Sequence, residues 1–527
     1  MIVMKKYSKI IFIALAFLGS ACTDLELSPK SEAVPDVVFQ DPDSYRQFLA
    51  KIYAGLSTTG QQGPAGSGDI QGIDEGFSSY IRMLFYAQEF PTETAHVGWN
   101  DQTIKDFAFH EWNSDDPFIA GLYYRLFYQV TIANAFLLES TEDKLSSRGF
   151  TDDVKKEIET YRTEARFLRA LSYWHALDLF RNIPFFTETD LGAEAPEQGT
   201  PQEVFDFIES ELLAIENALP GPGENQYGRA DRAAAWTLLA KLYLNAEVYI
   251  GQNRYADCLT YCSKVIDSGV FDLNPVFQHN FNADNHTSPE FIFPVTFDGL
   301  RTQGYGGTTF LTHAVVGGDM DKDDYGIDNG WGGVRVTRQF VELFPDVTGE
   351  IDSRAIFFTE GQNIDVTVDN VGAFENGYAM PKFTNITSEG DPGSNLGFPD
   401  TDFPVFRLAD VYLMYAECVV RGAGGDMGTA VEYVNRVRER AYGDDSGNIT
   451  EAELTEDFLL DERGRELAYE CHRRTDRIRF GKFTTEGLWQ LKGRADEGVP
   501  TPAWRNIYPI PSAEIIANPK LKQNPEY

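Results

Sequence analysis

Cys22 stands where covalent chemistry on its thiol is expected. It follows Leu18-Gly19-Ser20-Ala21 at the end of an apolar run from Ile10 that three lysines precede. The run is too short to cross the apolar core of a bilayer, so the pattern predicts a cleaved export signal over residues 1–21. The small residues before the cysteine favour a peptidase that leaves Cys22 as an acylated first residue. An ordinary secretory peptide with an incidental cysteine is the alternative.

Two tryptophans stand beside glycines in segments that lack helical periodicity. Trp99 follows Gly98, and Trp331 lies between Gly330 and Gly332. Aromatic residues make up 13% of the chain, so most of them must form the core. Glycine-flanked loops are a poor setting for core burial, however, and an indole combines a rigid apolar face with a hydrogen-bonding tip. A pyranose ring has a complementary C–H face, so these loops are candidate sugar-binding positions.

Motifs of catalytic chemistry are missing from the sequence. A glycosidase needs only two carboxylates about 5 to 9.5 Å apart, and with 81 acidic residues the sequence permits such a pair. There is no nucleophile elbow, zinc-binding His-Glu-x-x-His or phosphate loop, and the seven histidines show no ligand spacing. We therefore expect no enzyme and no required cofactor, with a surface glycoside hydrolase as the rival class.

Four cysteines remain besides Cys22. Cys258 and Cys262 lie four apart on an expected helix, where Cβ atoms are about 5 to 6 Å apart, wider than the roughly 3.5 to 4.5 Å of a disulfide. They are expected to be buried small residues. Cys418 and Cys471 could pair only if the fold brings them together.

The charge of the chain restricts its partners. The formal net charge is −36, and it becomes −39 once residues 1–21, with three lysines and no acid, are removed. Such a surface repels nucleic acid and anionic headgroups, whereas an uncharged glycan is indifferent to it. No other run approaches the length of a transmembrane helix, so we expect lipid to be the sole membrane anchor.

Two segments of 34 residues follow one plan of helix, break and helix, and that length is the period of tetratricopeptide repeats. Residues 233–266 break at Gly251-Gln252-Asn253, and residues 408–441 break at Gly422-Ala423-Gly424-Gly425. The helix expected over residues 162–181 is apolar on more than one face, as suits a helix between neighbours. Stacked helix pairs are therefore the expected frame.

Residues 55–115 and 271–404 differ in sequence pattern from the helical segments. Both are irregular, without helical periodicity, and the second has only short β-like runs such as Phe291 to Phe297. Long irregular segments on a helical scaffold are where binding residues are usually placed, so we expect these two regions to meet on one face.

An arginine-rich segment from Arg463 to Lys482 has interleaved acids. The alternation favours ion pairs along helix faces over anion binding. The acids are Asp461, Glu462, Glu466, Glu470 and Asp476.

Several short blocks, in order and spacing, resemble the SusD/RagB family of outer-membrane lipoproteins over nearly the whole mature chain. They are Glu164 to Ala170, Gly228 to Asp231, Leu242 to Ala246, Arg407 to Leu413 with Ala416-Glu417, Pro509-Ile510-Pro511, and Asn518-Pro519 with Gln523-Asn524-Pro525. The resemblance implies a mainly α fold, a tetratricopeptide-like helical repeat scaffold with a loop-rich irregular subdomain and few short strands. It also implies glycan capture without catalysis, as a lid over a SusC-like TonB-dependent transporter.

The expected domain boundaries follow from this resemblance. A lipid-anchored tether over residues 22–40 would lead into one family domain over residues 41–527. Its helical scaffold is expected at about 41–54, 116–270 and 405–485, its ligand-binding loops at about 55–115 and 271–404, and a C-terminal segment at 486–527.

The closest likeness is to the family's starch-binding founder, and it implies six glycan-binding residues. Trp99, Tyr305 and Trp331 match the positions of the founder's aromatic arc, and Asp74 and Arg82 match its polar contacts. Gln102 stands where the founder has asparagine.

Val97 replaces a further tryptophan of the founder at the rim, and local loop hydrogen bonds are the alternative role for Asp74, Arg82 and Gln102. The chemistry agrees with the resemblance, because Trp and Tyr rings offer stacking area and Arg82 offers a fork of donors to vicinal hydroxyls.

The resemblance also extends to a metal. Asp284 and Asp426 lie in segments like the loops that hold a calcium ion in the founder. Calcium takes six to eight oxygen ligands, and the sequence does not identify the others. We therefore expect a structural calcium ion, although these two aspartates alone do not make up its set of ligands.

The expected ligand is a neutral glucan. A starch-type α-1,4-glucan is favoured, a β-1,3-glucan of the laminarin type is the runner-up because it too is a curved helix, and a peptide-import lid is a further alternative. The expected location is the outer membrane, lipid-anchored and facing the cell exterior. Asp24 and Glu26 fit the acidic tether of such surface lipoproteins.

Overall fold

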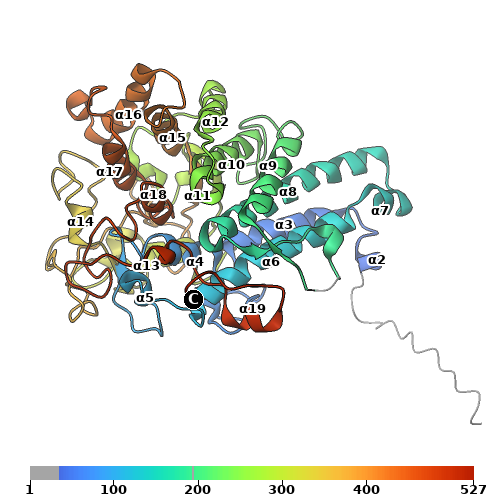
Figure 1. Ribbon diagram of the computed structural model, residues 1–527, viewed down its shortest axis with the longest axis horizontal. Coiled ribbons are helices and arrows are strands. Elements are labelled where there is room, and N and C mark those ends of the chain that lie inside the picture. Colours follow the sequence, from blue (N-terminus) through green and yellow to red (C-terminus); the bar gives the residue numbers. More distant parts are fainter. Residues whose placement is uncertain (1–34, 193–194) are drawn as a thin grey trace, which may run out of the picture. The chain divides into compact units, whose positions relative to one another are not determined.

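Helices dominate the computed structural model, which describes residues 35–192 and 195–527 (Figure 1). The prediction of a mainly α fold is confirmed. The predicted signal peptide, Cys22, Asp24 and Glu26 lie outside the described residues, as does most of the predicted tether. Within the described part of the chain, no helix combines the length and apolarity needed to cross a membrane.

The elements follow one another along the chain in this order. The α-helices are α2 (Pro35–Val38), α3 (Asp43–Ser57), α4 (Tyr80–Gln88), α5 (Asp106–Phe109), α6 (Pro117–Glu139), α7 (Glu142–Ser147), α8 (Asp152–Phe180), α9 (Pro201–Ile215), α10 (Arg232–Leu244), α11 (Ala246–Ile250), α12 (Tyr255–Asp267), α13 (Gly307–His313), α14 (Arg338–Val341), α15 (Leu408–Val420), α16 (Met427–Tyr442), α17 (Glu456–Leu467), α18 (Arg473–Arg479) and α19 (Ser512–Ala517). The short 3-10 helices are η1 (Glu75–Ser78), η2 (Glu188–Asp190), η3 (Phe277–Asn280), η4 (Asn285–Thr287), η5 (Lys322–Tyr325), η6 (Asp445–Gly447) and η7 (Ala503–Asn506). The strands are β1 (His96–Val97), β2 (Ile183–Pro184), β3 (Gln198–Gly199), β4 (Phe291–Val295), β5 (Val334–Arg335) and β6 (Phe403–Arg407).

Both predicted repeat units are confirmed as helix pairs. In the first, α10 packs on α12, and the chain turns at Gly251 with a positive φ of 69°, where a side chain would be strained. In the second, α15 packs on α16 across the glycine-rich break, and Asp426 caps α16. Since α12 also packs on α15, the two units stack into one helical array.

Helix α8 lies between α6 and α9, as its apolar residues on several faces predict. It begins at Asp152, well before the expected Arg162, because two acids in its first turn favour the positive end of the helix dipole. Asp116 accepts hydrogen bonds from the backbone N–H groups of Phe118 and Ile119 and so starts α6 at Pro117.

The prediction that residues 55–115 lack helices is wrong in part. Helices α4 and α5 lie in this region, and every residue of α4 is buried. α4 has only nine residues, and its polar residues Arg82 and Gln88 are buried, so they do not mark a face toward solvent. Short helices α13 and α14 similarly interrupt residues 271–404.

Two antiparallel strand pairs connect distant segments. β4 pairs with β6, and β6 leads directly into α15, which ties the irregular segment to the scaffold. β1 pairs with β5, with His96 opposite Arg335 and Val97 opposite Val334. The two irregular regions therefore meet, as the sequence predicts.

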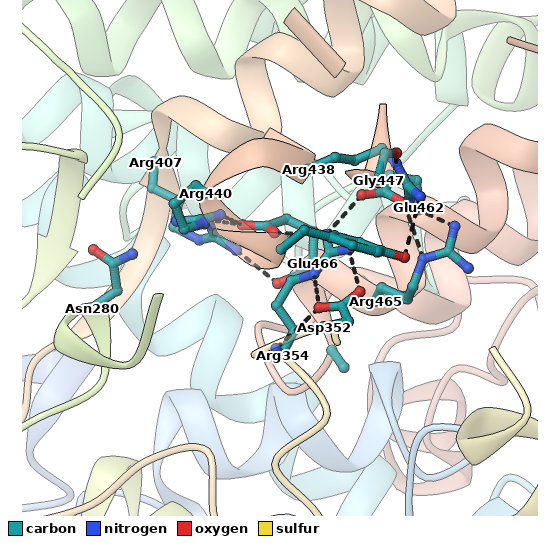
Figure 2. Close-up of polar contacts among 12 residues, drawn as sticks. Asn280, Asp352, Arg354, Arg407, Arg438, Arg440, Gly447, Glu462, Arg465 and Glu466 are labelled. Atoms are coloured by element: carbon teal, nitrogen blue, oxygen red, sulfur yellow. Dashed lines mark hydrogen bonds and ion pairs between the residues drawn. The ribbon is translucent and has the colours of Figure 1, made fainter. Parts of the chain in front are cut away.

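Ion pairs involving the arginine-rich segment and its acids are buried between elements, not arranged along exposed helix faces (Figure 2). Glu466 on α17 accepts hydrogen bonds from Arg354, Arg407 and Arg440, and both partners of each ion pair are almost fully buried. Arg463 pairs with Asp410 of α15 at 2.9 Å and with Asp476 of α18 at 2.8 Å. The structural interpretation holds: the pairs of Arg354 join the irregular segment to the scaffold, and those of Arg463 join scaffold helices to one another.

The four described cysteines are free thiols and buried. The sulfur atoms of Cys258 and Cys262 lie 3.9 Å apart, so these residues are unpaired as predicted. Cys418 and Cys471 do not form the disulfide that the sequence left open.

Candidate functional site

Three aromatic rings from the two irregular regions form one surface. The ring centroids of Trp99 and Trp331 lie 6.4 Å apart, and those of Tyr305 and Trp331 lie 6.3 Å apart. Tyr305 is 40% exposed, while both tryptophans are half-buried. The structure thus brings together the three aromatic residues predicted from the sequence, which we call the aromatic platform.

Backbone hydrogen bonds fix Trp331 on the end of α13. The N–H of Trp331 donates to the carbonyl of His313 at 2.8 Å, and that of Gly333 donates to the carbonyl of Ala314 at 2.8 Å. The His313 ring lies beside the indole of Trp331, with centroids 5.0 Å apart. Burial lowers the pKa of His313, so this support is neutral at physiological pH.

Trp99 packs on the backbone of Gly333. A Cβ atom at Gly333 would lie 2.2 Å from Cε2 of the Trp99 indole, so only glycine permits this approach. The Nε1–H group of Trp99 donates to the carbonyl of Trp331 at 3.2 Å. The two tryptophans are consequently held by each other's loops.

Arg335 of β5 holds the loops behind the platform. Its buried guanidinium donates to the carbonyls of Gly333 at 2.6 Å and Val371 at 2.7 Å, and also to those of Ala373 and Asn376. Burial lowers its pKa to about 10, and among the described residues no carboxylate forms an ion pair with it. Backbone dipoles therefore solvate this charge.

Arg82 of α4 lies beneath the platform and is only 5% exposed. Its Nη1 donates to the carbonyl of Tyr305 at 2.8 Å and to that of Gly76 at 3.2 Å, and its Nε donates to the Tyr86 hydroxyl at 2.8 Å. Its guanidinium carbon lies 5.8 Å from the ring centroid of Trp99 and 5.9 Å from that of Trp331. Much of the predicted donor fork is therefore occupied by protein, and Arg82 positions the rings.

Asp74 is exposed next to Tyr305. It precedes η1, and its Oδ1 accepts a hydrogen bond from the N–H of Gly76 at 3.0 Å. A Cβ atom on Gly76 would lie 2.8 Å from Cβ of Tyr305, so the η1 turn directly contacts that tyrosine. Because Asp74 is exposed, its carboxylate can accept further hydrogen bonds from a ligand.

The remaining predicted positions differ from one another. Gln102 is exposed on the turn after Trp99, with a positive φ of 31°, and no described contact joins it to the platform. Val97 is only 1% exposed, and its strand neighbour His96 is buried as well, so both faces of β1 are covered. The expectation that Val97 lies at the rim is therefore wrong.

Phe398 is a platform residue that the sequence analysis missed. Its ring centroid lies 5.7 Å from that of Tyr305, and the side chain is half-buried. It follows Gly397 and precedes Pro399, so the glycine-flanked pattern used for Trp99 and Trp331 also applies to it. His313, by contrast, has no neighbouring residues in the sequence that would mark it as a support for Trp331.

Asp284 and Asp426 have structural roles as they stand. Asp284 accepts hydrogen bonds from the N–H and hydroxyl of Ser388, and Asp426 accepts them from Thr429 at the start of α16. Within residues 35–192 and 195–527, no group of three or more His, Cys, Asp or Glu residues could hold a metal ion. A calcium ion at either aspartate would have to take its other ligands from backbone carbonyls, amides and water, and it stays a prediction.

Comparisons with known proteins decide the family. The family model described as "SusD family" matches residues 347–527, and the one described as "Starch-binding associating with outer membrane" matches residues 74–244. Starch-binding protein SusD of Bacteroides thetaiotaomicron is 34% identical over 582 residues, covering 99% of each chain. The chain belongs to the SusD family.

Solved structures share the fold of this SusD-family protein. Surface glycan-binding protein A from Bacteroides fluxus has a TM-score of 0.70 and 21% identity, covering 92% of this chain and 99% of that one. The same-named protein from Bacteroides thetaiotaomicron in complex with laminarihexaose has a TM-score of 0.67 and 22% identity, with the same coverage. These likenesses confirm the predicted SusD-like fold.

Membership of the SusD family also decides the broad function. Proteins of this family bind glycans without catalysing a reaction, so the prediction that the chain is not an enzyme is confirmed. It is a surface glycan-binding protein of a family associated with the outer membrane.

Proposed function

We propose that this protein captures neutral glucan chains on the aromatic platform, with starch-type α-1,4-glucan as the preferred ligand, and delivers them to a SusC-like TonB-dependent transporter. The observation that carries this proposal is the contact of Trp99, Trp331 and Tyr305 across two distant loop regions. The relative named for starch binding, at 34% identity, supports the α-glucan preference.

The platform suits a curved, uncharged chain for physical reasons. Ring planes inclined by 49° between Trp99 and Trp331, and by 59° between Tyr305 and Trp331, form a bent surface instead of a flat one. A helical glucan that already has this curvature loses little conformational freedom on docking. Asp74 and the exposed edge of Tyr305 can then orient hydroxyl groups beside the stacked rings.

A β-1,3-glucan of the laminarin type is the second candidate. A protein with the same fold has been solved in complex with laminarihexaose, although its 22% identity leaves its ligand preference a separate matter. The β-1,3-glucan chain is also a curved helix of neutral sugars. The curvature match between glucan and platform would then decide between the two.

Isothermal titration with maltoheptaose, laminarihexaose and a neutral peptide tests the ligand class. We expect maltoheptaose to bind, and Trp331→Ala to weaken binding at least tenfold, since truncating a central anchor tryptophan of a binding surface costs about 2 kcal/mol or more and about 1.4 kcal/mol is tenfold. Trp236→Ala is the matched control, because Trp236 is also half-buried but lies on α10 and bonds to Glu216. It should leave affinity unchanged.

Other results would redirect the proposal. Preference for laminarihexaose would select the second candidate, and peptide binding would select an import lid. Steady release of reducing ends from starch would contradict a non-catalytic role. Equal glucan affinity in the parent and Trp331→Ala would remove the platform from the function.

The anchor and location form part of the proposal. Acylation at Cys22 would hold the protein in the outer membrane, facing outward, with Asp24 and Glu26 directing it to the surface. Cys22→Ala should release the protein from the membrane fraction. Replacing Asp24 and Glu26 should protect it from protease added to intact cells, and full protease access would contradict the role of these acids.

A further inference from the structure

We propose that a cavity between α3 and the turn at residues 226–229 is a second sugar-binding position, which extends the aromatic platform for long glucan chains. The cavity has a volume of about 350 Å³ and is open to solvent on one side. This inference rests on the proposed function, because its ligand is the same neutral chain.

One face of helix α3 forms a wall of the cavity. The lining residues recur at helical spacing from Arg46 through Ala50 and Ala54 to Ser57, with Tyr53 among them. The small side chains at positions 50, 54 and 57 lie one turn apart and leave the hollow open. The opposite wall carries Gln226, Tyr227 and Arg229, and the end of β4 closes the floor.

Two tyrosines present rings whose hydroxyl groups are already engaged. The Tyr227 hydroxyl donates to Asp402 at 2.6 Å, and the Tyr53 hydroxyl donates to Glu164 at 2.7 Å. These bonds fix the ring orientations, while Tyr227 remains 44% exposed. A fixed, exposed aromatic face next to a cavity is the same stacking element that the platform uses.

Two polar residues of the wall opposite α3, Arg229 and Gln226, suit a neutral ligand. Arg229 is neutralised by a bidentate pair with Glu164, in which Nε and Glu164 Oε2 are 2.9 Å apart. The side-chain amide of Gln226 is exposed at the rim and can bond to sugar hydroxyls in either direction. A neutral polyol with one apolar face fits these groups.

Two segments connect the cavity to the platform. Thr302 lines the cavity, and Tyr305 of the platform is three residues further on, which limits their Cα separation to about 11 Å. On the other side, Ser57 lines the cavity, and Thr59 bonds to Glu75, the neighbour of Asp74. Gly304 lies beside both Thr59 and Glu75, so the two segments also contact each other.

A glucan chain that leaves the platform past Tyr305 would therefore reach the cavity within a short distance. Two linked positions on one chain increase affinity through effective concentration, without new contacts at either position. The arrangement predicts that affinity rises with chain length, and that the cavity contributes only for long chains.

Isothermal titration with maltotriose and with soluble amylose tests this inference, with laminaritriose and laminarin as the parallel pair. Ala54→Trp fills the cavity, and Tyr227→Ala removes the stacking ring. Each should weaken amylose binding at least about tenfold, as expected for loss of one of two linked positions. Maltotriose affinity should change less than twofold, and Tyr227→Phe, which keeps the ring but loses the bond to Asp402, should weaken amylose binding less than Tyr227→Ala does.

The outcomes separate this inference from the proposed function. If both cavity variants melt like the parent and bind amylose unchanged, while Trp331→Ala still weakens maltotriose binding, the second position is refuted and the platform stands. If Trp331→Ala affects neither probe, the proposed function itself fails. If Ala54→Trp does not fold, Tyr227→Ala against Tyr227→Phe decides the question.

Discussion

Arg82 gives the sharpest test of how the platform is built. The resemblance to the starch-binding founder predicts that this residue contacts the ligand. In the structure it lies beneath the rings of the aromatic platform. It is 5% exposed and donates three hydrogen bonds to protein atoms, namely the carbonyls of Gly76 and Tyr305 and the hydroxyl of Tyr86. No described carboxylate pairs with it. Arg82→Met preserves the apolar stem and removes the charge with its bonds.

The expected loss of stability follows from the groups left behind. Each unsatisfied buried acceptor costs about 1 to 3 kcal/mol, and loss of the cation beside the rings costs about 0.5 to 2 kcal/mol. Removing a buried guanidinium recovers several kcal/mol of desolvation, so a net loss of about 3 kcal/mol is expected. At about 2.1 cal/mol/K of unfolding entropy per residue, a chain of this length should melt about 3 °C lower.

Affinity should fall together with stability. Because the Tyr305 carbonyl loses its partner, the tyrosine ring is no longer held against Trp331, and glucan affinity should fall at least tenfold. Differential scanning calorimetry and isothermal titration measure the two effects. Arg301→Met is the control, since Arg301 is 85% exposed and pairs only with Asp298 within the described residues. If Arg82→Met binds poorly but melts like the parent, the positioning role is refuted and direct ligand contact is supported.

Three further predictions concern the packing of the site and the buried charges. Gly333→Ala should displace the Trp99 indole, which lies 2.2 Å from the added Cβ, and so weaken glucan binding and shift tryptophan fluorescence. Glu89→Gln should stabilise the protein at pH 8 but not at pH 5 in urea titrations, because burial raises the pKa of Glu89 to about 7. The folded state therefore binds the Glu89 proton more tightly than the unfolded state, and that contribution to stability is lost as pH rises through 7. Arg407→Met should cost about 3 to 5 kcal/mol in the same titrations, since it leaves Glu290, Glu466 and Glu470 buried without this partner.

Controls for these variants come from the same chain. Gly372→Ala should bind glucan normally, because its Cβ would have no neighbour closer than 3.8 Å. Lys322→Met should not alter the unfolding midpoint, since Lys322 and its partner Asp323 are exposed. Equal stabilisation by Glu89→Gln at both pH values would contradict the assigned titration. An unchanged midpoint for Arg407→Met would contradict the importance of the buried network.

Local pattern predicts much of the scaffold because each helix carries its own signals. The stripes and glycine breaks of residues 233–266 and 408–441 specify helix pairs before any contact is known, and Gly251 takes the left-handed conformation at the predicted break. Helix α4 escaped prediction because it is short and its polar residues, Arg82 and Gln88, are buried instead of facing solvent. The arginine-rich segment was interpreted as structural, but its partners, such as Asp410, come from other elements.

The platform shows the same division between local and tertiary information. Glycine neighbours and ring type marked Trp99 and Trp331 as loop aromatics, and the family resemblance added Tyr305, Asp74, Arg82 and Gln102. Val97 was misplaced because β1 pairs with β5, far along the chain, and both residues of β1 are buried there.

The helical repeat plan and the family resemblance could be read from the chain's composition, period and motif order, which also predict an export signal and a neutral class of ligand. Only the tertiary structure decided that residues 99, 305 and 331 share one surface, and that Arg82 lies beneath it. The reason is physical: Trp99 and Trp331 are separated by more than 200 residues along the chain, and pairing of β1 with β5 brings them into contact. The oxygen atoms that accept hydrogen bonds from the Arg82 guanidinium are likewise determined by packing and not by neighbours in the sequence.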